Sequence, residues 1–307
     1  MSDALFLGVD GGATTTRAVV VDATGTERGR GAAGGANQSA IGAGSAAANV
    51  RAAAAQAVAA AGGAADEVRA AWVGLAGVDR PADREAFAPL LAPLAPAVRL
   101  TNDAALGLAA LPGGVGVMLI AGTGAIALGA NAGGDTARAS GWGWLLGDEG
   151  SGFWLGLQAL RAATRAADER SGPTALLPAL LDHLHLSQPS DLIPWTYAER
   201  DNAKIAALAP LVFATARDGD ATARGIVRLA VSELSSAVAA VADELGFPDG
   251  IPLALGGSLL LNEVGFRKAI VRQFRRVEPL ALVHDAAIAA ARGAIALARG
   301  ATEGAGA

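Results

Sequence analysis

Two short apolar runs near the start of the chain predict a pair of β-strands joined by a tight turn. The runs cover residues 5–9 and 17–21, and both are rich in residue types that favour strands. The turn between them contains two glycines and three threonines, and Ala23-Thr24-Gly25 ends the second run. This pattern predicts a β-hairpin.

A second pair of apolar runs repeats this plan near the middle of the chain. The runs at residues 115–121 and 125–129 flank the tripeptide Gly122-Thr123-Gly124, and they follow a Pro-Gly-Gly break at residues 112–114. Internal duplication of this kind indicates a fold made of two similar units. Two such turns that faced each other across a cleft would clamp the phosphates of one nucleotide.

Strands and helices alternate along most of the remaining chain. Further buried strands are expected at residues 70–75, 98–100 and 251–255, and residues 34–39 are expected to form a polar loop. Ser45 can cap the first helix. Such alternation predicts an α/β fold. Helical spacing of apolar residues predicts helices at 44–61, 81–91, 104–111, 153–167, 174–186, 203–216, 222–245 and 285–299.

The length of 307 residues favours two domains, because a domain typically has about 150 residues. We expect an N-terminal domain at 1–113 and a C-terminal domain with a helical insertion at 114–284. A terminal helix at 285–300 is expected to pack on the N-terminal domain, ahead of a disordered tail at 301–307. Hydrophobic residues make up 52% of the chain but aromatic residues only 4%, so alanine, leucine and valine must supply the core.

The net charge and the absence of cysteine exclude several kinds of binding partner and cofactor. A net charge of −5 disfavours nucleic acids and anionic membranes, which call for a basic surface, and leaves small molecules as the expected partners. The absence of cysteine excludes a disulfide framework, a cysteine nucleophile and a thiolate-held iron–sulfur cluster. The N-terminus lacks the positive segment of a signal peptide, and no run reads as a membrane span, so a cytoplasmic protein is expected.

The first turn has the residue types of a phosphate site. Gly11 and Gly12 let backbone N–H groups approach an anion closely, and Thr14 and Thr15 add hydroxyl donors. Asp10, at the end of the first strand, can hold a hydrated Mg²⁺. The turn is not a Walker A loop, because a strand follows it and it contains no lysine. An ordinary tight hairpin is the alternative interpretation.

A carboxylate follows the strand at residues 98–100. Thr101, Asn102 and Asp103 lie between this strand and the next expected helix, which is where α/β folds place catalytic groups. A simple helix N-cap is the alternative, because Asn and Asp both favour that position.

A loop at residues 140–152 combines five glycines with two tryptophans. Tryptophan stacks well on a sugar ring, and a nearby carboxylate such as Asp148 can accept hydrogen bonds from sugar hydroxyls. Alternatively, Trp142 and Trp144 form a small core and Asp148 or Ser151 caps the next helix. We expect one tryptophan in the core and one at the site.

Taken together, the motifs resemble those of the N-acetylglucosamine kinase branch of the benzoyl-CoA reductase activator-type ATPase family, in the acetate and sugar kinase/Hsc70/actin superfamily. The resemblance covers roughly positions 5 to 299. It implies two ribonuclease H-like α/β domains with the active site in the cleft between them. The motifs are Asp10-Gly11-Gly12-x-Thr14, Asn37, Asn102-Asp103, Gly122-Thr123-Gly124, Gly141-Trp142-Gly143, Gly147-Asp148-Glu149-Gly150-Ser151 and Gly256-Gly257-Ser258.

The resemblance also implies roles, with ATP and Mg²⁺ as cofactors. Asp103 matches the catalytic base that deprotonates the sugar 6-hydroxyl, and Asp10 matches the carboxylate associated with Mg²⁺. The nucleotide positions are Gly11, Gly12, Thr14, Thr15, Gly122, Thr123 and Gly124 on the phosphates and Gly256, Gly257 and Ser258 on the adenosine. The sugar positions are Asn37, Gly77, Asn102, Asp103, Gly141, Trp142 and Asp148.

The chain departs from the family pattern after the second turn. Ala125 and Ile126 stand where serine and another polar residue reach the sugar, so glucosamine or N-acetylmuramic acid remain alternatives to N-acetylglucosamine. Two other classes compete with a kinase. An ATPase that powers electron transfer would need the cysteines that this chain lacks. A sugar sensor without phosphoryl transfer on the same scaffold remains open, as does a homodimer.

Overall fold

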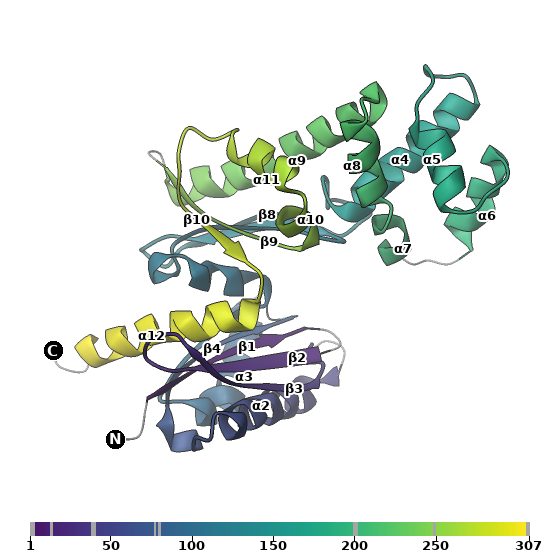
Figure 1. Cartoon of the computed structure of the whole chain (residues 1–307). Helices are drawn as coiled ribbons and strands as arrows, with labels where there is room; N and C mark the ends of the chain where they lie inside the picture. Colours follow the sequence, from purple (N-terminus) through teal and green to yellow (C-terminus); the bar gives the residue numbers. More distant parts are fainter. Residues whose placement is uncertain are drawn as a thin grey trace.

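The computed structural model contains two five-stranded sheets and describes residues 4–12, 15–37, 41–76, 78, 81–198, 202–247 and 250–304 (Figure 1). The strands of the first sheet are β1 (Leu5–Gly11), β2 (Thr15–Val21), β3 (Glu27–Gly34), β4 (Val68–Leu75) and β5 (Ala97–Asn102). Those of the second are β6 (Gly116–Ala121), β7 (Ala125–Ala130), β8 (Thr136–Ser140), β9 (Ile251–Gly256) and β10 (Val277–Val283).

Both sheets have the same topology. Their strand orders are β3-β2-β1-β4-β5 and β10-β9-β6-β7-β8, so β1 and β6 are the central strands of equivalent sheets. In each sheet the central strand pairs antiparallel with the next strand of the hairpin and parallel with a later strand. The predicted α/β class and the internal duplication are therefore confirmed.

Helices surround the two sheets. The α-helices are α2 (Ala43–Ala60), α3 (Pro81–Leu91), α4 (Gly152–Ala167), α5 (Leu176–His183), α6 (Leu192–Tyr197), α7 (Asn202–Ala206), α8 (Ala209–Arg217), α9 (Ala221–Leu245), α10 (Ser258–Asn262), α11 (Val264–Val271) and α12 (Ala286–Gly304). Short 3₁₀ turns are η1 (Ala65–Glu67), η2 (Ala92–Leu94), η3 (Ala104–Ala110), η4 (Pro112–Gly114) and η5 (Pro189–Asp191).

The first sheet is buried on both faces because alternate residues of β1 point to opposite sides. Leu7 packs in a cluster with α2 and α3, whereas Phe6 packs in another with α12. α12 lies across the first sheet, between it and the second (Figure 1). Gly8 permits this close packing, because a Cβ at Gly8 would overlap the backbone of Ala287 and Ala291 in α12.

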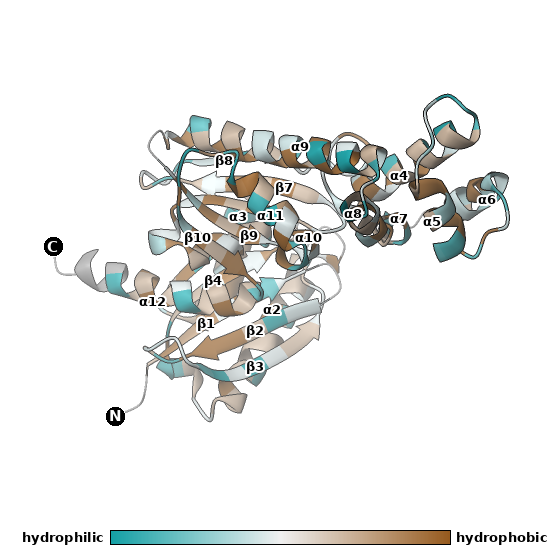
Figure 2. Ribbon diagram, turned by 45° about the horizontal axis from the view of Figure 1, so that its top comes forward, coloured by the Kyte–Doolittle hydropathy of each residue, from teal (hydrophilic) through white to brown (hydrophobic). Residues whose placement is uncertain are grey.

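The turn η3 lies between the two sheets. Leu106 belongs to the cluster of the first sheet and α12, whereas Leu108 and Leu111 pack with Met118 and Leu128 of the second sheet. The opposite face of the second sheet carries a larger core that includes α4, α8 and α9. Strongly hydrophobic stretches lie both on strands such as β2 and β9 and on helices such as α5 (Figure 2). Because η3 begins after Asp103, its packing fixes that residue between the sheets.

Three strands are absent from the prediction, namely β3, β8 and β10. All three are edge strands. β3 and β8 contain polar residues, glycine and alanine, and β10 has apolar residues at 280–283 but is mostly exposed. The expected polar loop at 34–39 therefore begins at the end of β3. The helix expected at 203–216 is two helices, α7 and α8, and α8 has a proline in its first turn.

Other differences concern helix ends. Ser45 is not the cap of α2, which begins after Gly42, a residue with φ of 81° and no side chain that could cap. α12 continues to Gly304, beyond the expected end at 300, and residues 305–307 lie outside the described residues. α9 is long and apolar enough to cross a membrane, contrary to expectation, but half of its most apolar window is buried inside the protein. Its burial in the core explains this composition.

Candidate functional site

A cavity of about 590 Å³ opens between the two sheets and gathers residues from both. Asp10 reaches it from β1, and Asn102 and Asp103 reach it from the end of β5. The lining on the other side comes from the β6–β7 turn, the β8 end and the following loop, and comprises Ile120, Gly122, Thr123, Gly124, Ala125, Ile126, Arg138, Gly141, Gly143 and Asp148. Residues far apart in sequence therefore form one site, which we call the catalytic cavity.

Asp103 lies at the start of η3 and lines the catalytic cavity at the same time. Its carboxylate accepts a hydrogen bond from the backbone N–H of Ala104 at 2.9 Å. Asn102 caps the same turn, because its Oδ1 accepts from the N–H of Ala105 at 2.8 Å. The capping interpretation is therefore correct, and it is compatible with a chemical role because capping fixes the direction of the carboxylate.

Asp10 is a partly buried carboxylate beside other acids. Burial raises the pKa of Asp10 to about 6, the carboxylates of Asp103 and Asp285 add to the rise, and Arg17 opposes it. A bound cation would relieve this repulsion. The described residues contain no group of three or more metal-ligating side chains. Mg²⁺ needs no such group, because it often binds one or two carboxylates together with waters and phosphates.

The β6–β7 turn is held by the N-terminus of α4. The N–H of Gly152 donates to the carbonyl of Gly122 at 2.7 Å, and the N–H of Phe153 donates to that of Thr123 at 3.1 Å. Ser151 caps the helix, because its Oγ accepts from the N–H of Trp154 at 3.2 Å. Ser151, and not Asp148, is therefore the cap. These bonds fix the turn in a defined conformation at the cavity.

A second cavity of about 280 Å³ lies on the other side of the same turn. Gly122 and Thr123 line both cavities, and Ser258 lines the second. Gly257 has φ of 87°, and a Cβ there would overlap the backbone carbonyl of Ala121. The strand-to-helix turn at residues 256–258 therefore lies directly against the end of β6. Residues from α7, α8 and α10 complete the second cavity.

Asp148 approaches the β6–β7 turn closely. A Cβ on Gly124 would lie 2.9 Å from Oδ2 of Asp148. Glycine at this position therefore leaves room for the Asp148 carboxylate. Burial raises the pKa of Asp148, although backbone N–H groups of Ala125 and Gly143 stabilise its charged form. Beside it, Ala125 and Ile126 give the cavity an apolar wall.

The two tryptophans of the 140–152 loop are both exposed. Trp142 is 68% exposed and Trp144 is 51% exposed, so the expectation that one of them belongs to the core is wrong. Trp144 packs edge-to-face against Phe153, and the two ring centroids are 5.6 Å apart. Trp142 does not line the catalytic cavity; the guanidinium of Arg138 lies 5.0 Å from its ring.

Several predicted site residues do not line the catalytic cavity. In the first turn, the N–H of Gly12 donates to the carbonyl of Thr15 at 3.0 Å, and the carbonyl of Gly11 accepts from Ala76 at 2.8 Å. Asn37 is half-buried, and its carbonyl accepts from the N–H of Ile41 at 3.2 Å. Gly256 ends β9, next to Gly257. Thr14 and Gly77 lie outside the described residues.

Arg138 lines the catalytic cavity, although no sequence motif marks it as a site residue. It lies on β8, a strand that the apolar pattern does not reveal. One arginine in an exposed segment carries no signal of function, so only the folded structure places it at the site.

Comparisons with known proteins agree with this geometry. The model of the BadF/BadG/BcrA/BcrD ATPase family matches residues 7–298. The chain is 31% identical over 312 residues to an N-acetyl-D-glucosamine kinase of Dictyostelium discoideum, covering 95% of this chain and 98% of that protein. It is 32% identical over 246 residues to an N-acetylmuramic acid/N-acetylglucosamine kinase of Clostridium acetobutylicum, covering 76% and 78%.

A solved structure has the same two-lobed fold. It is a candidate N-acetylglucosamine kinase from Chromobacterium violaceum, with a TM-score of 0.69 and 29% identity over 97% of this chain and 100% of that one. The family model spans nearly all of the chain, including both turns and the residues of the catalytic cavity. The chain therefore belongs to the BadF/BadG/BcrA/BcrD ATPase family.

Proposed function

We propose that the protein is a kinase that transfers the γ-phosphate of ATP to the 6-hydroxyl of an amino sugar, with N-acetylglucosamine as the favoured acceptor. The observation that carries this proposal is that Asp103, Asp10 and the β6–β7 turn line a single cavity. The similar kinases of Dictyostelium discoideum and Clostridium acetobutylicum are both named for N-acetylglucosamine. The proposed partners are thus a sugar and a nucleotide.

Phosphoryl transfer requires positioning and charge neutralisation more than covalent catalysis. Asp103 would accept the proton of the attacking hydroxyl. Its hydrogen bond to the first residue of η3 orients the carboxylate for this role. Asp10 would hold a hydrated Mg²⁺, which when bound neutralises phosphate charge. Gly11, Gly12, Thr14, Thr15 and the β6–β7 turn would surround the phosphates, while residues 256–258 and the second cavity would receive the adenosine.

The sugar would lie between Asp103 and the loop that carries Asp148. Asp148 can accept hydrogen bonds from sugar hydroxyls, and Asn37, Gly77, Asn102, Gly141 and Trp142 are the other proposed contacts. Trp142 would have to move to reach the sugar, and closure of the two lobes would bring such a movement and exclude water. The apolar Ala125 and Ile126 leave glucosamine and N-acetylmuramic acid as alternative acceptors.

A sugar panel tests the kinase. With ATP and Mg²⁺ present, the rate of ADP release should rise when N-acetylglucosamine or a close relative is added. The rates measured with glucosamine, N-acetylmuramic acid and glucose then rank these sugars as acceptors. If no sugar stimulates ADP release, the kinase assignment fails. If a sugar binds in calorimetry but never accelerates ADP release, the protein is a sensor on the kinase scaffold.

We further propose that the enzyme works in the cytoplasm, with no nucleic acid or membrane as partner. Its net charge of −5 favours small anionic or neutral ligands that are bound in a pocket over polyanionic surfaces. A homodimer is the assembly to test by light scattering, since dimers are the commonest symmetric assembly.

A further inference from the structure

A cavity of about 650 Å³ lies where the two lobes are joined, and we call it the hinge cavity. Its walls come from both connections between the lobes and from the first sheet. The lining comprises Trp72 of β4, Arg99 of β5, residues 109–114 around η3 and η4, and Arg292, Gly293, Ala296 and Leu297 of α12. None of these residues lines the catalytic cavity or the second cavity, so the hinge cavity is a separate site.

The ring of Trp72 contacts every wall of the hinge cavity. Trp72 is 2% exposed, and the guanidinium of Arg99 lies 4.0 Å from the centre of its ring. A Cβ on Gly114 of η4 would lie 2.9 Å from this ring, and a Cβ on Gly293 of α12 would lie at the same distance. Both connections between the lobes therefore pack against one side chain. A movement of the lobes would change the shape of the hinge cavity.

Two arginines give the hinge cavity a positive charge. Arg292 donates through Nε to the carbonyl of Gly25 at 3.0 Å, and Arg99 is held on the Trp72 ring. No described carboxylate lines the cavity or forms an ion pair with either arginine. Burial lowers the pKa of Arg99, because burial disfavours a charge that no anion neutralises. The charge of both guanidinium groups is therefore available to a ligand.

The remaining lining fits a ligand that is larger than a bare anion. Guanidinium groups bind phosphate or carboxylate through parallel hydrogen bonds. Leu111 and Leu297 supply apolar walls, together with alanines of η3 and α12. The volume of the cavity lies within the range of about 300–1,000 Å³ that small-molecule sites occupy. The lining therefore suits an oxyanion attached to an organic body.

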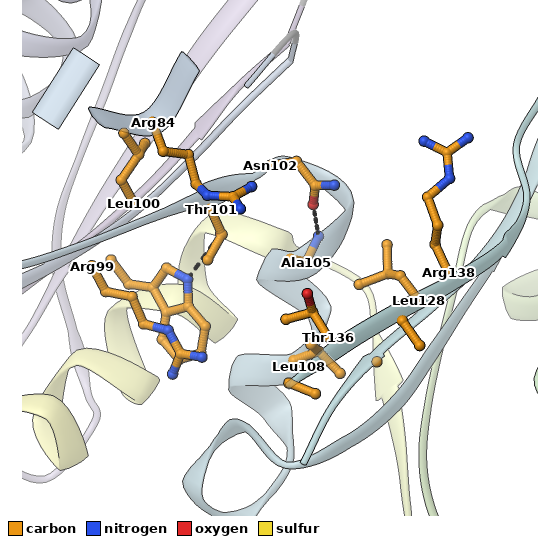
Figure 3. Close-up of a pocket in the computed structure, with 14 residues that line it drawn as sticks. Arg84, Arg99, Leu100, Thr101, Asn102, Ala105, Leu108, Leu128, Thr136 and Arg138 are labelled. Carbon is orange, nitrogen blue, oxygen red and sulfur yellow. Dashed lines mark hydrogen bonds between the residues drawn. The ribbon is translucent and has the colours of Figure 1, made fainter. Parts of the chain in front are cut away.

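Continuous structure connects the hinge cavity to the catalytic cavity. A smaller cavity of about 340 Å³ adjoins both (Figure 3). Trp72 and Arg99 line the smaller cavity and the hinge cavity, whereas Asn102 and Arg138 line the smaller cavity and the catalytic cavity. Arg99 and Asn102 are three residues apart on β5. A ligand that displaces Arg99 would therefore act on the strand that leads to Asp103.

The turn η3 joins the two sites directly. Asp103 caps its first residue in the catalytic cavity, and its last residues, Ala109 and Ala110, line the hinge cavity. Figure 3 shows the start of this turn, where Asn102 accepts a hydrogen bond from Ala105 at 2.8 Å. One end of η3 thus holds the proposed base while the other end forms a wall of the hinge cavity.

We propose that the hinge cavity is a regulatory site for a small molecule that bears an oxyanion, and that its occupancy changes the affinity for the sugar. A ligand that fits one arrangement of the lobes better than another shifts the lobes towards that arrangement. The binding site stands independently of the kinase, whereas the effect on the sugar rests on the proposed function. The oxyanion is either free inorganic phosphate or the phosphate of an organic ester, for which glucose 6-phosphate is the probe.

Two substitutions and a matched control test the site by calorimetry. Arg292→Gln and Arg99→Gln each remove one charge from the hinge cavity, whereas Arg161→Gln removes an exposed helical arginine of α4 outside the cavities described above. Inorganic phosphate and glucose 6-phosphate are titrated into each protein. Arg292→Gln is the decisive variant, because Arg292 lines neither the catalytic cavity nor the second cavity.

Glucose 6-phosphate should bind the wild type, and its Kd should rise about tenfold or more in both hinge variants, because hydrogen bonds to a charged group are lost. Arg161→Gln should bind as the wild type does, and Arg292→Lys should retain part of the affinity through its charge. Thermal melting checks that each variant folds. If Arg99→Gln fails to fold, Arg292→Gln and Arg292→Lys still give the comparison. Equal affinity for inorganic phosphate would identify the free ion as the ligand.

The regulatory effect is measured by titrating N-acetylglucosamine with and without glucose 6-phosphate. The Kd of the sugar should change about fivefold or more in the wild type and remain constant in Arg292→Gln. Direct competition at the sugar site would instead persist in Arg292→Gln and would overturn the regulation, as would an unchanged Kd in the wild type.

The site itself is overturned if neither anion binds the wild type, or if both hinge variants bind the anions as tightly as the wild type does. Phosphorylation of N-acetylglucosamine in the absence of either anion reports separately on the kinase function. A failure of the hinge site and a failure of the kinase assignment are therefore distinguishable.

Discussion

At the scale of single residues, the site depends on carboxylates whose surroundings differ. Asp103 is fixed by capping η3, Asp10 is buried beside Asp103 and Asp285, and Asp148 is held by backbone N–H groups. These environments suit different tasks, because fixing a direction serves a base and accumulated negative charge attracts a cation.

Replacing Asp103 should separate binding from chemistry. Asp103→Asn retains a side chain able to cap η3, so the fold and ATP binding should persist. Removal of a general base should lower kcat by about 10²- to 10⁴-fold. Steady-state kinetics and nucleotide calorimetry check this result, with the exposed Asp218→Asn as the control. Near-normal turnover of Asp103→Asn would refute the assignment of the base.

Asp10 should make stability depend on pH. Its pKa is about 6 in the folded protein and 3.8 for an unperturbed aspartate, so the folded state binds the proton more tightly. Its contribution is therefore favourable below about pH 4 and is lost as pH rises through 6. Asp10→Asn should stabilise the metal-free protein at pH 8 by up to about 3 kcal/mol, and by little at pH 4.

Unfolding curves at pH 4 and pH 8, without and with Mg²⁺ and ADP, measure this difference. Mg²⁺ with ADP should raise the Tm of the wild type more than that of Asp10→Asn, because the variant lacks the anionic ligand. Equal pH dependence in the two proteins would contradict the buried carboxylate at this position.

At the scale of elements, glycines determine how closely helices approach the first sheet. Gly8→Ala should destabilise the protein by about 1–3 kcal/mol, because its Cβ would overlap the backbone of α12. Gly44→Ala in α2 is the matched control, since nothing lies within 4 Å of its Cβ, and it should change stability by less than about 1 kcal/mol. Urea unfolding measures both, and equal effects would contradict the close packing of α12.

The helices and strands that could be predicted from the sequence are those that depend on residues close together in the chain. The buried central strands appear as apolar runs, and α3 occupies residues 81–91 as expected because proline starts it and an apolar face follows. β3 and β8 could not be recognised in this way, because they contain no long apolar run. The apolar residues 280–283 of β10 could have indicated a strand.

The candidate site was predictable where function follows from position in an element. Asp103 follows the end of a parallel strand, and the glycine-rich turn occurs twice in the sequence. Asp103 and the two turns could therefore be identified without coordinates. The exposure of Trp142 and Trp144 could not, because the contacts available to a side chain in a glycine-rich loop depend on tertiary structure.

At the scale of the whole molecule, the two sheets form two similar lobes with the catalytic cavity between them. We propose that they correspond to domains at 1–113 and 114–284, joined through η3 and through α12, which packs on the first sheet. A kinase of this design must use ATP only when the sugar is present, and movement of the lobes about these connections would provide that control.

Identification of the reaction product distinguishes a sugar kinase from an ATPase that does not phosphorylate sugar. The protein is incubated with ATP, Mg²⁺ and N-acetylglucosamine, and phosphorus and proton NMR locate the transferred phosphate. We predict a 6-phosphate ester that forms with the wild type and is nearly absent with Asp103→Asn. Release of inorganic phosphate at the same rate with and without any sugar of the panel, and no sugar phosphate, would contradict it.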